Sequence, residues 1–423
     1  MSFIEISMKQ ELKNQKRRYL EKTEQSLFFS GFGSRGSQIL KKQLPRSLFG
    51  ITTLSGKGVS VGETGGVPHD MHKGFWQNLS KPIIGLAPMD GVTDAAFRFI
   101  TAKYGHPHFQ ITEFTSVEGI CAGATRALDA FIYNEEERPI VAQLFGNTPE
   151  CFYKATFVVC ELGFDGVDIN MGCPAKNVAS KGAGAALIQT PELAKKIIHS
   201  VQQAAKDWAN GKTVEEAEIP STIMEHIKFL NNKNFPSRKI TRKVLPVSVK
   251  TRIGYDHSIV EEWIKHILET KPVNISLHGR TLKQMYSGNA DWEAIGRAAT
   301  IIHQTQTTIL GNGDIKSLNE AHQKILDYSV DGVLIGRATF GNPWFFQNHE
   351  AKIEERLNIA IEHAEIHEKA FGKRLFMPMR KHLAWYCKGF SGASEVRQKL
   401  MQTTSAEEVK KILNGLDLQE PLL

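Results

Sequence analysis

Short apolar runs alternate with helix-length segments along the chain from about residue 81. Eight runs follow this pattern: Ile83–Ala87, Phe109–Thr112, Ile140–Phe145, Gly166–Asn170, Val247–Lys250, Val273–His278, Thr308–Leu310 and Gly332–Ile335. Such runs, separated by helical stretches, are typical of strands in a parallel sheet. Eight β-α units over about 260 residues have the size of a (β/α)8 barrel, so the pattern predicts an α/β fold of the TIM-barrel type. A doubly wound open sheet is the competing architecture.

Polar residues and glycines gather at the carboxyl ends of these runs, whereas the opposite ends are plain. The eight carboxyl-end segments are 87–91, 112–114, 143–146, 170–174, 250–252, 278–280, 311–314 and 336–337. In a barrel these ends converge on one face, which is where active sites are built. The asymmetry therefore predicts a barrel enzyme with one polar mouth.

Other segments flank and interrupt the barrel pattern. Residues 1–78 combine a charged, helix-prone start with a Gly/Ser-rich stretch that lacks periodicity, which predicts a disordered extension. The barrel is expected over residues 79–345, with an insertion at about 208–244 that carries one helix near Ser221–Leu230. Beyond the barrel, apolar residues recur at helical spacing, so residues 346–423 are expected to form a separate all-α helical domain.

The net charge of +7 is unevenly distributed. Residues 1–78 hold twelve Lys/Arg and six Asp/Glu, a local charge of +6, which leaves about +1 for the rest of the chain. The stretch from Lys369 to Lys399 holds eight Lys/Arg and one acid, interleaved with aromatic residues. Cations in this stretch could follow a phosphate backbone, so we expect RNA binding; the alternative is a solvated amphipathic helix. The cations that suit this role are Arg380, Lys381, Lys388, Arg397 and Lys399, and the first three are the candidate tRNA-binding residues.

The five cysteines, at positions 121, 151, 160, 173 and 387, form no CxxC pair and no zinc-binding spacing. An odd, dispersed set is typical of reduced thiols in a cytoplasmic protein, so we expect no disulfide framework and no metal site. His363 and His367 lie one helical turn apart, but Glu365 between them is misplaced for the HExxH metal motif. No apolar run approaches the roughly 20 residues of a membrane-spanning helix.

Three polar residues surround the end of the fourth apolar run. Asn170, Cys173 and Lys176 lie where the strand stops, and Pro174 fixes the backbone after the sulfur. A thiol at a strand end, beside an amide and an ammonium, suits chemistry, although a buried structural cysteine is the alternative. The downstream segment GAGAA at residues 182–186 does not open the first β-α unit, so it fails as a dinucleotide-binding loop. We expect it to form a flexible loop over the active site.

The remaining strand ends suit a flavin nucleotide. Lys250 and Gln143 place a cation and an amide at the mouth, where they suit a planar heterocycle whose carbonyl edge gains negative charge on reduction. The alternative for Lys250 is a structural ion pair with a carboxylate. Loops after the seventh and eighth strands of such barrels frequently hold a phosphate. The residues there that suit a phosphate are His278, Asn312, Gly313, Asp314, Gly336 and Arg337.

Several of the strand-end motifs are distinctive. They are APMDGVTD at 87–94, NMGCPAK at 170–176, HGRT at 278–281, NGDI at 312–315, GRATFGNP at 336–343, and MRKHLAWY at 379–386 with KGF at 388–390. Together they resemble the tRNA-dihydrouridine synthase family, most closely its bacterial B-type branch. The resemblance covers roughly residues 81–413, and the last two motifs are similar to the family's C-terminal helical domain.

This resemblance implies an FMN-dependent oxidoreductase that reduces the C5=C6 bond of selected tRNA uridines, with NADPH as the usual reductant and NADH left open. By position, Cys173 would donate a proton to C5 of the uracil. The flavin would be bound by Pro88, Met89, Asp90, Gln143, Lys250, His278, Asn312, Gly313, Asp314, Gly336 and Arg337. Asp90 departs from the alanine common at its position. The uridine or the RNA beside it would contact Asn170, Lys176 and Arg252, and the helical domain would bind tRNA.

We expect a monomeric, cytoplasmic enzyme with tRNA and NAD(P)H as partners and no membrane association. Two alternatives stay open at this point. One is another FMN-dependent TIM-barrel oxidoreductase that acts on a small molecule, as dihydroorotate dehydrogenases do; the basic helical domain argues against it. The other is an RNA-binding protein without catalytic activity, which a failure to bind FMN would favour.

Overall fold

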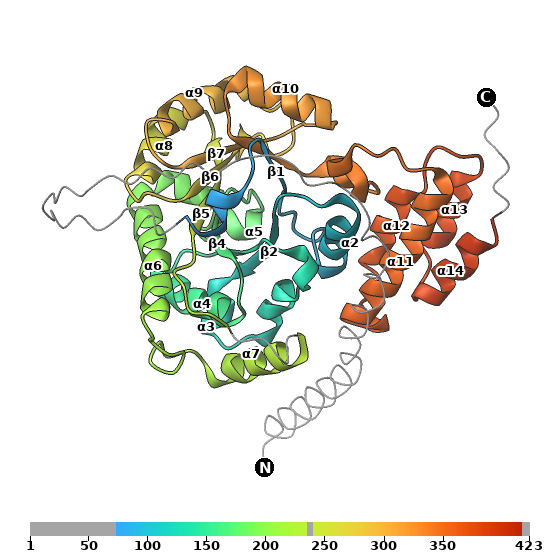
Figure 1. Cartoon of the computed structure of the whole chain (residues 1–423), viewed down its shortest axis with the longest axis horizontal. Coiled ribbons are helices and arrows are strands. Elements are labelled where there is room, and N and C mark those ends of the chain that lie inside the picture. The colour runs from blue at the N-terminus through green and yellow to red at the C-terminus, as the bar shows by residue number, and fades with distance from the viewer. Residues whose placement is uncertain (1–72, 235–239, 417–423) are drawn as a thin grey trace, which may run out of the picture.

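Eight parallel strands form a closed barrel in the computed structural model, which describes residues 73–234 and 240–416 (Figure 1). The strands follow one another around the barrel in sequence order, and β8 pairs with β1. The TIM-barrel prediction is confirmed. The strand bounds are β1 Ile83–Leu86, β2 Gln110–Ser116, β3 Ile140–Phe145, β4 Gly166–Met171, β5 Val247–Gly254, β6 Asn274–Thr281, β7 Thr308–Asn312 and β8 Gly332–Ile335.

The strand register brings distant polar residues together at one edge of the barrel. Asn170 on β4 pairs with Lys250 on β5. Arg252 on β5 pairs with His278 on β6, and His278 in turn pairs with Asn312 on β7. Because neighbouring strands lie roughly 5 Å apart, these side chains can act on one ligand although they are spread over more than 140 positions in the sequence.

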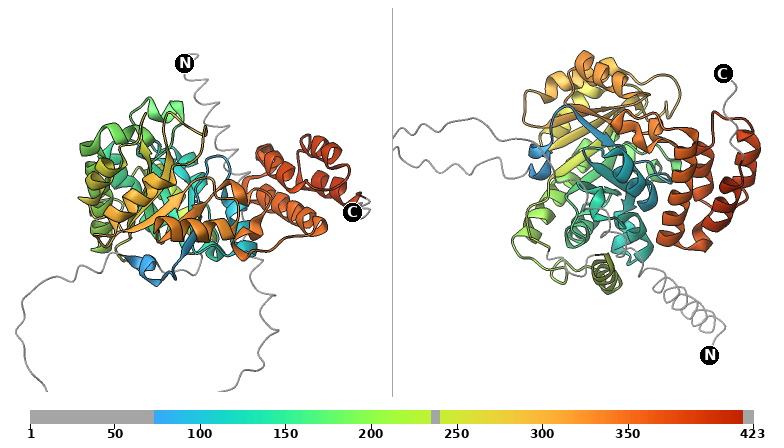
Figure 2. Two further views of the ribbon diagram at one scale, coloured as in Figure 1. Left: turned by 90° about the horizontal axis from the view of Figure 1, so that it is seen from above. Right: turned by 45° about the vertical axis from the view of Figure 1, so that its right-hand side comes forward.

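Helices cover the outside of the barrel (Figures 1 and 2). The barrel α-helices are α2 Ala95–Gly105, α3 Val117–Cys121, α4 Pro149–Glu161, α5 Lys176–Ala179, α6 Pro191–Ala209, α7 Ser221–Asn234, α8 Val260–Leu268, α9 Trp292–Ile302 and α10 Leu318–Tyr328. Short 3-10 helices are η2 Gly74–Asn78, η3 Thr125–Phe131, η4 Glu135–Glu137, η5 Gly184–Gln189, η6 Arg337–Thr339 and η7 Pro343–Gln347.

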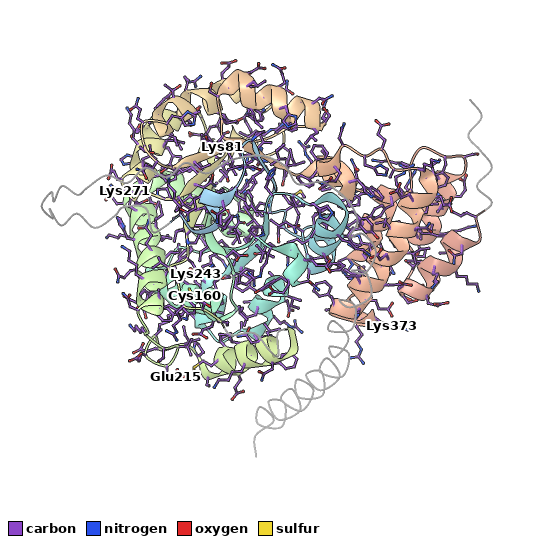
Figure 3. All side chains as sticks on the ribbon, in the orientation of Figure 1. Lys81, Cys160, Glu215, Lys243, Lys271 and Lys373 are labelled. Atoms are coloured by element: carbon purple, nitrogen blue, oxygen red, sulfur yellow. A yellow bond between two sulfur atoms is a disulfide. The ribbon has the colours of Figure 1, made fainter. Side chains whose placement is uncertain are left out.

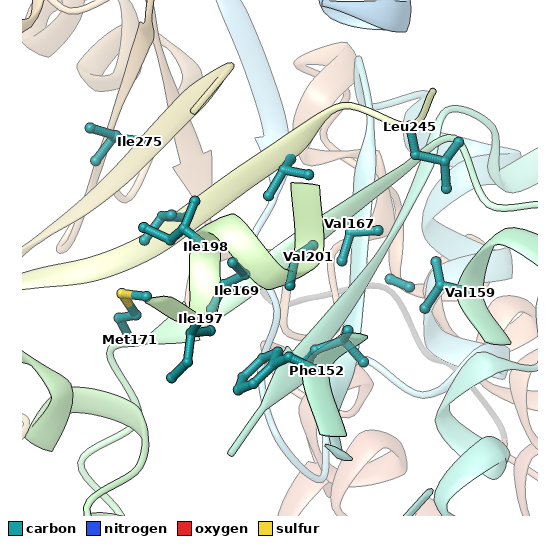
Figure 4. Packing of buried hydrophobic residues seen from close by; sticks show 14 of the residues in the cluster. Phe152, Val159, Val167, Ile169, Met171, Ile197, Ile198, Val201, Leu245 and Ile275 are labelled. Atoms are coloured by element: carbon teal, nitrogen blue, oxygen red, sulfur yellow. The ribbon is translucent and has the colours of Figure 1, made fainter. Parts of the chain in front are cut away.

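Successive side chains of β4 point in turn to the hydrophobic core outside the barrel and to the barrel interior. Val167, Ile169 and Met171 belong to the main hydrophobic cluster together with residues of α4 and α6, as Figure 4 shows. Successive side chains of a strand point to opposite faces, so Asp168 and Asn170 point into the barrel. The apolar residues of this run therefore anchor the strand, and its polar residues supply the interior.

The packed part of the chain begins a few residues before the expected boundary at residue 79. Trp76 in η2 is buried, and its ring centroid lies 4.8 Å from that of Phe109. Phe75 packs on the same ring at 6.1 Å. These aromatic rings belong to a hydrophobic cluster that also contains Ile83 at the start of β1 and Leu334 in the middle of β8. The predicted disorder of the preceding residues concerns positions 1–72, which lie outside the described residues.

The insertion before β5 carries the expected helix. Helix α7 (Ser221–Asn234) begins where the sequence predicted and ends a few residues later. Its apolar side packs against the main core through Ile223, Ile227 and Leu230, which are buried. Glu215, earlier in the same insertion, lies at the edge of the barrel away from the C-terminal helices, on which Lys373 lies (Figure 3). The described part of the insertion is thus a packed surface element of the barrel.

The C-terminal helices form a second core at one side of the barrel (Figures 1 and 2). They are α11 Ile353–Phe371, η8 Lys373–Leu375, α12 Met379–Tyr386, α13 Ala393–Leu400 and α14 Ala406–Asn414. Their hydrophobic cluster also includes Ile100 of α2 and Trp344 of η7, so the two parts share buried contacts. Within residues 73–234 and 240–416, no helix has both the length and the apolar character that crossing a membrane requires.

One expectation about the cysteines is wrong. Cys121 at the end of α3 and Cys151 in the first turn of α4 are joined by a disulfide. The two helices pack side by side after β2 and β3, which brings together cysteines that are 30 residues apart, and sequence spacing does not reveal this. Cys160, Cys173 and Cys387 are free and buried.

Candidate active site at the carboxyl ends of the strands

A cavity of about 1920 Å³ opens at the carboxyl ends of the strands and extends toward α12 and α13. The residues proposed from the sequence that line it are Pro88, Met89, Asp90, Asn170, Cys173, Lys250, Arg252, His278, Asn312, Gly313, Asp314, Gly336, Arg337 and Lys388. The remaining candidates, Gln143, Lys176, Arg380 and Lys381, do not line it. The structure thus gathers most of the predicted site around one cavity.

The loop that carries Cys173 is held from both sides. Asn170 Oδ1 accepts hydrogen bonds from the backbone N–H groups of Gly172 at 3.0 Å and Cys173 at 2.8 Å. On the other side, Ala185 N–H donates to the Cys173 carbonyl at 3.1 Å. Ala185 belongs to η5 (Gly184–Gln189), which is largely buried. The expected flexible loop at 182–186 is therefore wrong for its second half, because small residues there pack beneath the cysteine and support it.

The thiol of Cys173 stays protonated at neutral pH. Its side chain is only 9% exposed and packs with Val178 and Ala183, with Phe114 and Phe145 against this group. Burial raises the pKa of the Cys173 thiol, and a backbone hydrogen bond at Ala175 only partly opposes the rise. A neutral thiol beside an open cavity can give up a proton, whereas a thiolate nucleophile would need its pKa lowered.

Gln143 lies behind the cavity wall and supports it. Its side chain is fully buried. Gln143 Oε1 accepts from Asn170 Nδ2 at 2.9 Å, and Gln143 Nε2 donates to Asp168 Oδ2 at 2.7 Å. The sequence assigned Gln143 to the flavin ring, but both of these observed partners are protein side chains. Asp168 was not singled out from the sequence at all.

Lys250 lies in the cavity wall, and among the described residues no carboxylate accepts a hydrogen bond from it. Its Nζ donates to Asn312 Oδ1 at 3.2 Å. Burial and the positive charge of Arg252 lower the pKa of Lys250 to about 8, although Asp168 and Cys173 oppose the shift. Arg252 is itself buried, and its guanidinium donates to the carbonyls of Gly172 at 2.6 Å and Thr281 at 3.0 Å. The ammonium of Lys250 thus lies at the cavity with one observed side-chain partner, whereas the Arg252 guanidinium is bonded to backbone carbonyls.

Two arginines converge on Asp314 at the ends of β6, β7 and β8. Arg280 Nη2 lies 2.6 Å from Asp314 Oδ2, and Arg337 Nη2 lies 2.7 Å from Asp314 Oδ1. Burial alone would raise the pKa of Asp314, but hydrogen bonds from Ala290 N–H and Arg280 and the charges of both arginines hold it below its usual value. Asp314 is therefore an ionised orienting group for the two arginines.

His278 completes this end of the cavity as a neutral imidazole. Burial holds the pKa of His278 well below its usual value, and the nearby charges of Lys250, Arg252, Arg280 and Arg337 act in the same direction. The site therefore has a cationic end to which His278 adds a neutral ring with one N–H donor. Arg280, which pairs with Asp314, was part of the HGRT motif but was not assigned a role from the sequence.

These residues fit the phosphate and sugar chain of a flavin nucleotide. The donors at the ends of β5 to β8 are cationic or neutral, and the carboxylate of Asp314 beside them is paired with two arginines. Further from the strand ends, the cavity lining also includes the carboxylates of Asp291, Glu293 and Glu320. Gly313, with φ of +132°, has no room for a side chain, because a Cβ there would lie 2.6 Å from Ala290 Cβ. The packing of Ala290 and the positive φ therefore both require glycine at this turn. Among the described residues, no three His, Cys, Asp or Glu side chains form a group that could hold a metal.

The loop that carries Pro88, Met89 and Asp90 is clamped by both parts of the chain. Thr93 Oγ1 accepts from Met89 N–H at 2.9 Å, which closes the loop on itself. Lys381 Nζ of α12 donates to the Gly91 carbonyl. The Lys381 side chain therefore joins the helical domain to the candidate flavin loop.

The other basic candidates differ in their surroundings. Arg380 Nε donates to the Thr403 carbonyl at 2.9 Å and so ties α12 to the turn before α14. Lys176 is exposed at the start of α5, outside the cavity lining. Lys388 is exposed and lines the cavity, as does Arg397.

An aromatic pair that the sequence did not single out forms part of the cavity wall. The rings of Phe340 and Trp385 stack with centroids 3.9 Å apart and an interplanar angle of 12°. Gly341, with φ of +63°, allows this contact between barrel and helical domain, since a Cβ there would lie 2.2 Å from the Trp385 carbonyl oxygen. Trp385 is within the basic aromatic stretch, but its stacking partner precedes it by 45 positions, which the local pattern does not indicate.

Comparison with known proteins shows which protein family the chain resembles in sequence. A family model described as dihydrouridine synthase (Dus) matches residues 85–230 and 237–420. The probable tRNA-dihydrouridine synthase 2 of Bacillus subtilis is 35% identical over 356 residues, covering 82% of this chain and 98% of that protein. The probable tRNA-dihydrouridine synthase of Staphylococcus epidermidis is 34% identical over 357 residues, covering 82% and 97%.

A crystal structure of DHODH from Eimeria tenella has a TM-score of 0.42 at 16% identity, covering 68% of this chain and 83% of that chain, a likeness too low to bear on function. The sequence relatives and the family model agree with each other over most of the chain. The chain therefore belongs to the dihydrouridine synthase family of oxidoreductases.

Proposed function

We propose that this protein is an FMN-dependent tRNA-dihydrouridine synthase that reduces the C5=C6 bond of uridines in tRNA, with NADPH or NADH as the reductant. The observation that carries the proposal is the neutral Cys173 thiol in the same cavity as Lys250, His278, Arg280 and Arg337. A proton donor and a cationic cradle in one cavity are what a flavin-dependent reduction of a pyrimidine requires. The relatives are named as probable tRNA-dihydrouridine synthases.

The residues divide the work of binding and proton transfer. When bound, the flavin supplies a hydride to C6 of the uracil. Lys250 would hold its ring, and Arg280, Arg337 and His278 would hold its phosphate and sugar chain. Cys173 would then give its Sγ proton to C5, which balances the hydride and completes the reduced base. Because the Cys173 loop is fixed by Asn170, the thiol is positioned before the substrate arrives.

The rest of the cavity suits RNA. A uridine must leave its stack to reach a barrel mouth, and bases outside a stack are commonly held by aromatic rings and cations. Phe340 and Trp385 form an aromatic wall where the cavity meets the helical domain, and Lys388 and Arg397 lie on the same side. This side is where we place the tRNA backbone.

The function is tested by expressing the protein in a bacterial strain whose tRNA lacks dihydrouridine. We expect dihydrouridine to return at defined tRNA positions, read by mass spectrometry of tRNA digests. The unaltered protein would restore it and a Cys173→Ala variant would not. Unmodified tRNA with a soluble, flavin-loaded protein would favour the small-molecule oxidoreductase, and a protein that binds no FMN would favour the RNA-binding alternative.

FMN affinity should weaken as the pH rises through about 8. The pKa of Lys250 is lowered to about 8, so its ammonium is present below that pH and is lost above it. A hydrogen bond to a charged group contributes about 1.5–3 kcal/mol, so Lys250→Met should weaken FMN binding roughly 10- to 100-fold at pH 7. Titration of FMN into the apo-protein between pH 6 and 9.5 measures both effects. An equal pH dependence in the variant would show that another group is responsible.

Lys388 and Lys381 should differ in how they affect tRNA binding. Lys388 is exposed at the cavity, so Lys388→Met should reduce the slope of log K against log salt by about 1, as loss of one phosphate contact does. Lys381 donates to the Gly91 carbonyl, so Lys381→Met should leave that slope unchanged and weaken FMN binding. Filter binding of tRNA at several salt concentrations measures the slopes. A slope reduced by Lys381→Met would place this side chain on the RNA instead.

A further inference from the structure

Asp168 is a buried carboxylate that the mechanism above does not use. It lies on β4 with its side chain inside the barrel and is 0% exposed. Asp168 Oδ1 accepts from Ser248 Oγ at 2.6 Å, and Asp168 Oδ2 accepts from Gln143 Nε2 at 2.7 Å. Burial raises the pKa of Asp168 to about 6, and the hydrogen bonds from Ser248 and Gln143 limit the rise. The group is therefore ionised at neutral pH, and an ionised carboxylate can only accept hydrogen bonds.

A chain of hydrogen bonds runs from this carboxylate to the loop of the proton donor. Gln143 donates to Asp168 through Nε2, and its Oε1 accepts from Asn170 Nδ2 at 2.9 Å. Asn170 Oδ1 then accepts from the backbone N–H groups of Gly172 and Cys173 at 3.0 and 2.8 Å. Gln143 is 0% exposed and Asn170 is 7% exposed, so water does not compete strongly for these bonds.

The chemistry of its two ends determines which way each amide in the chain points. Asp168 can only accept, so the NH2 group of Gln143 must face it and the Gln143 oxygen must face Asn170. The same rule turns the NH2 group of Asn170 toward Gln143 and its oxygen toward Cys173. The backbone N–H groups at the far end can only donate, so they demand the same orientation. The two ends of the hydrogen-bond chain therefore require the same orientation of the Gln143 and Asn170 amides. Neither amide can flip without leaving buried groups unpaired.

We propose that Asp168 is a positioning residue that, as an obligatory acceptor, orients Gln143 and Asn170 and through them holds the Cys173 loop in place. The inference rests on the proposed function of Cys173 as the proton donor. Asp168 touches neither the cavity nor the reacting atoms. It acts through two amides, over a path in which each link is a hydrogen bond of 2.7–3.0 Å.

The competing role for Asp168 is that of a counter-charge to Lys250. The two residues lie on neighbouring strands, and the Asp168 charge favours the protonated form of Lys250. The two roles differ in what they require of residue 168. A counter-charge needs the negative charge itself. An acceptor needs only an oxygen toward Gln143, which asparagine also supplies if Ser248 turns its hydroxyl to accept.

Amide hydrogen exchange of Gly172 and Cys173, measured by mass spectrometry on the flavin-free protein, separates these roles. Asp168→Leu removes the acceptor and should speed exchange of these two amides by about tenfold relative to the amides of β3, the scale of one net hydrogen bond. Asp168→Asn should exchange within about twofold of the native protein, on the same scale. Native exchange in Asp168→Leu would overturn the proposal. Equal acceleration in both variants would also overturn it, because charge would then be the cause.

Two further measurements keep the test decisive. Should Asp168→Leu not fold, Gln143→Met breaks the same chain one link later, and native exchange in that variant would refute the proposal. In the flavin-loaded enzyme, Asp168→Leu should lower kcat for tRNA reduction while KM for tRNA stays unchanged, with Asp168→Asn close to native. Because the exchange experiment needs neither flavin nor tRNA, an inactive native enzyme would refute the proposed function without altering the exchange result.

Discussion

Replacing Cys173 by alanine should slow the reduction of uridine in tRNA by about 10²- to 10⁴-fold, the contribution of a positioned general acid. The thiol lies at the wall of the cavity, and its loop is held by Asn170 and Ala185. Without Sγ, the proton for C5 must come from water that no positioned acid holds beside the base. Single-turnover measurement of dihydrouridine formation gives the rate directly.

The raised pKa of Cys173 sets the pH dependence of the same step. The acid form is the active one, so the single-turnover rate should stay level through neutral pH and fall as the pH rises through the raised pKa. The control for Cys173→Ala is the visible spectrum of the bound flavin and the rate of its reduction by NADPH, neither of which needs this proton. A variant that forms dihydrouridine at the native rate would rule out Cys173 as the donor.

Replacing Arg98 by methionine should lower the free energy of unfolding by about 3–5 kcal/mol, the cost of breaking a buried ion pair on one side. Arg98 Nε lies 2.8 Å from Glu137 Oε2, and both side chains are at most 1% exposed. Arg98 also donates to the carbonyls of Thr93 at 2.7 Å and Ile132 at 2.6 Å. Its loss leaves a buried carboxylate without its cation and frees the end of the candidate flavin loop.

The matched control for Arg98→Met is the double variant Arg98→Met/Glu137→Met. Because the second change removes the stranded carboxylate, the two substitutions together should cost less than the sum of the single ones. Urea unfolding of all four proteins gives the free energies and their coupling. A cost below about 1 kcal/mol for Arg98→Met, the value of a surface ion pair, would contradict the buried role.

The barrel was predictable because its strands are short apolar runs at regular intervals. The bounds of β3 and β8 agree with the prediction, since β3 begins and ends with apolar residues and β8 contains only glycine and apolar residues. The ends of β5 and β6 were placed too early. Both strands continue into the polar mouth as far as Gly254 and Thr281, and these extensions consist mainly of glycine and polar or charged residues such as Arg252. A prediction from hydrophobicity alone ends each strand at its first basic residue and therefore does not include this extension.

The site was predictable where a residue's position at a strand end decides its role. Lys250, His278 and Arg337 reach the cavity for that reason. Roles that depend on a partner far away in sequence were missed. Asp168 owes its role to hydrogen bonds from Gln143 and Ser248, and Arg280 owes its role to the ion pair with Asp314. The basic stretch was predicted to be one RNA-binding surface, but its individual cations contact different partners in the structure. Lys388 lines the cavity, whereas Lys381 and Arg380 bond backbone carbonyls.

The central claim is that electrons from a flavin in this barrel reach a uridine in tRNA. The most direct measurement is to reduce the purified, flavin-loaded protein under anaerobic conditions and to add tRNA that lacks dihydrouridine. Our account predicts that the flavin is reoxidised only when this tRNA is added, with one dihydrouridine formed for each flavin reoxidised. Reoxidation without dihydrouridine, or no reoxidation by tRNA, would contradict it.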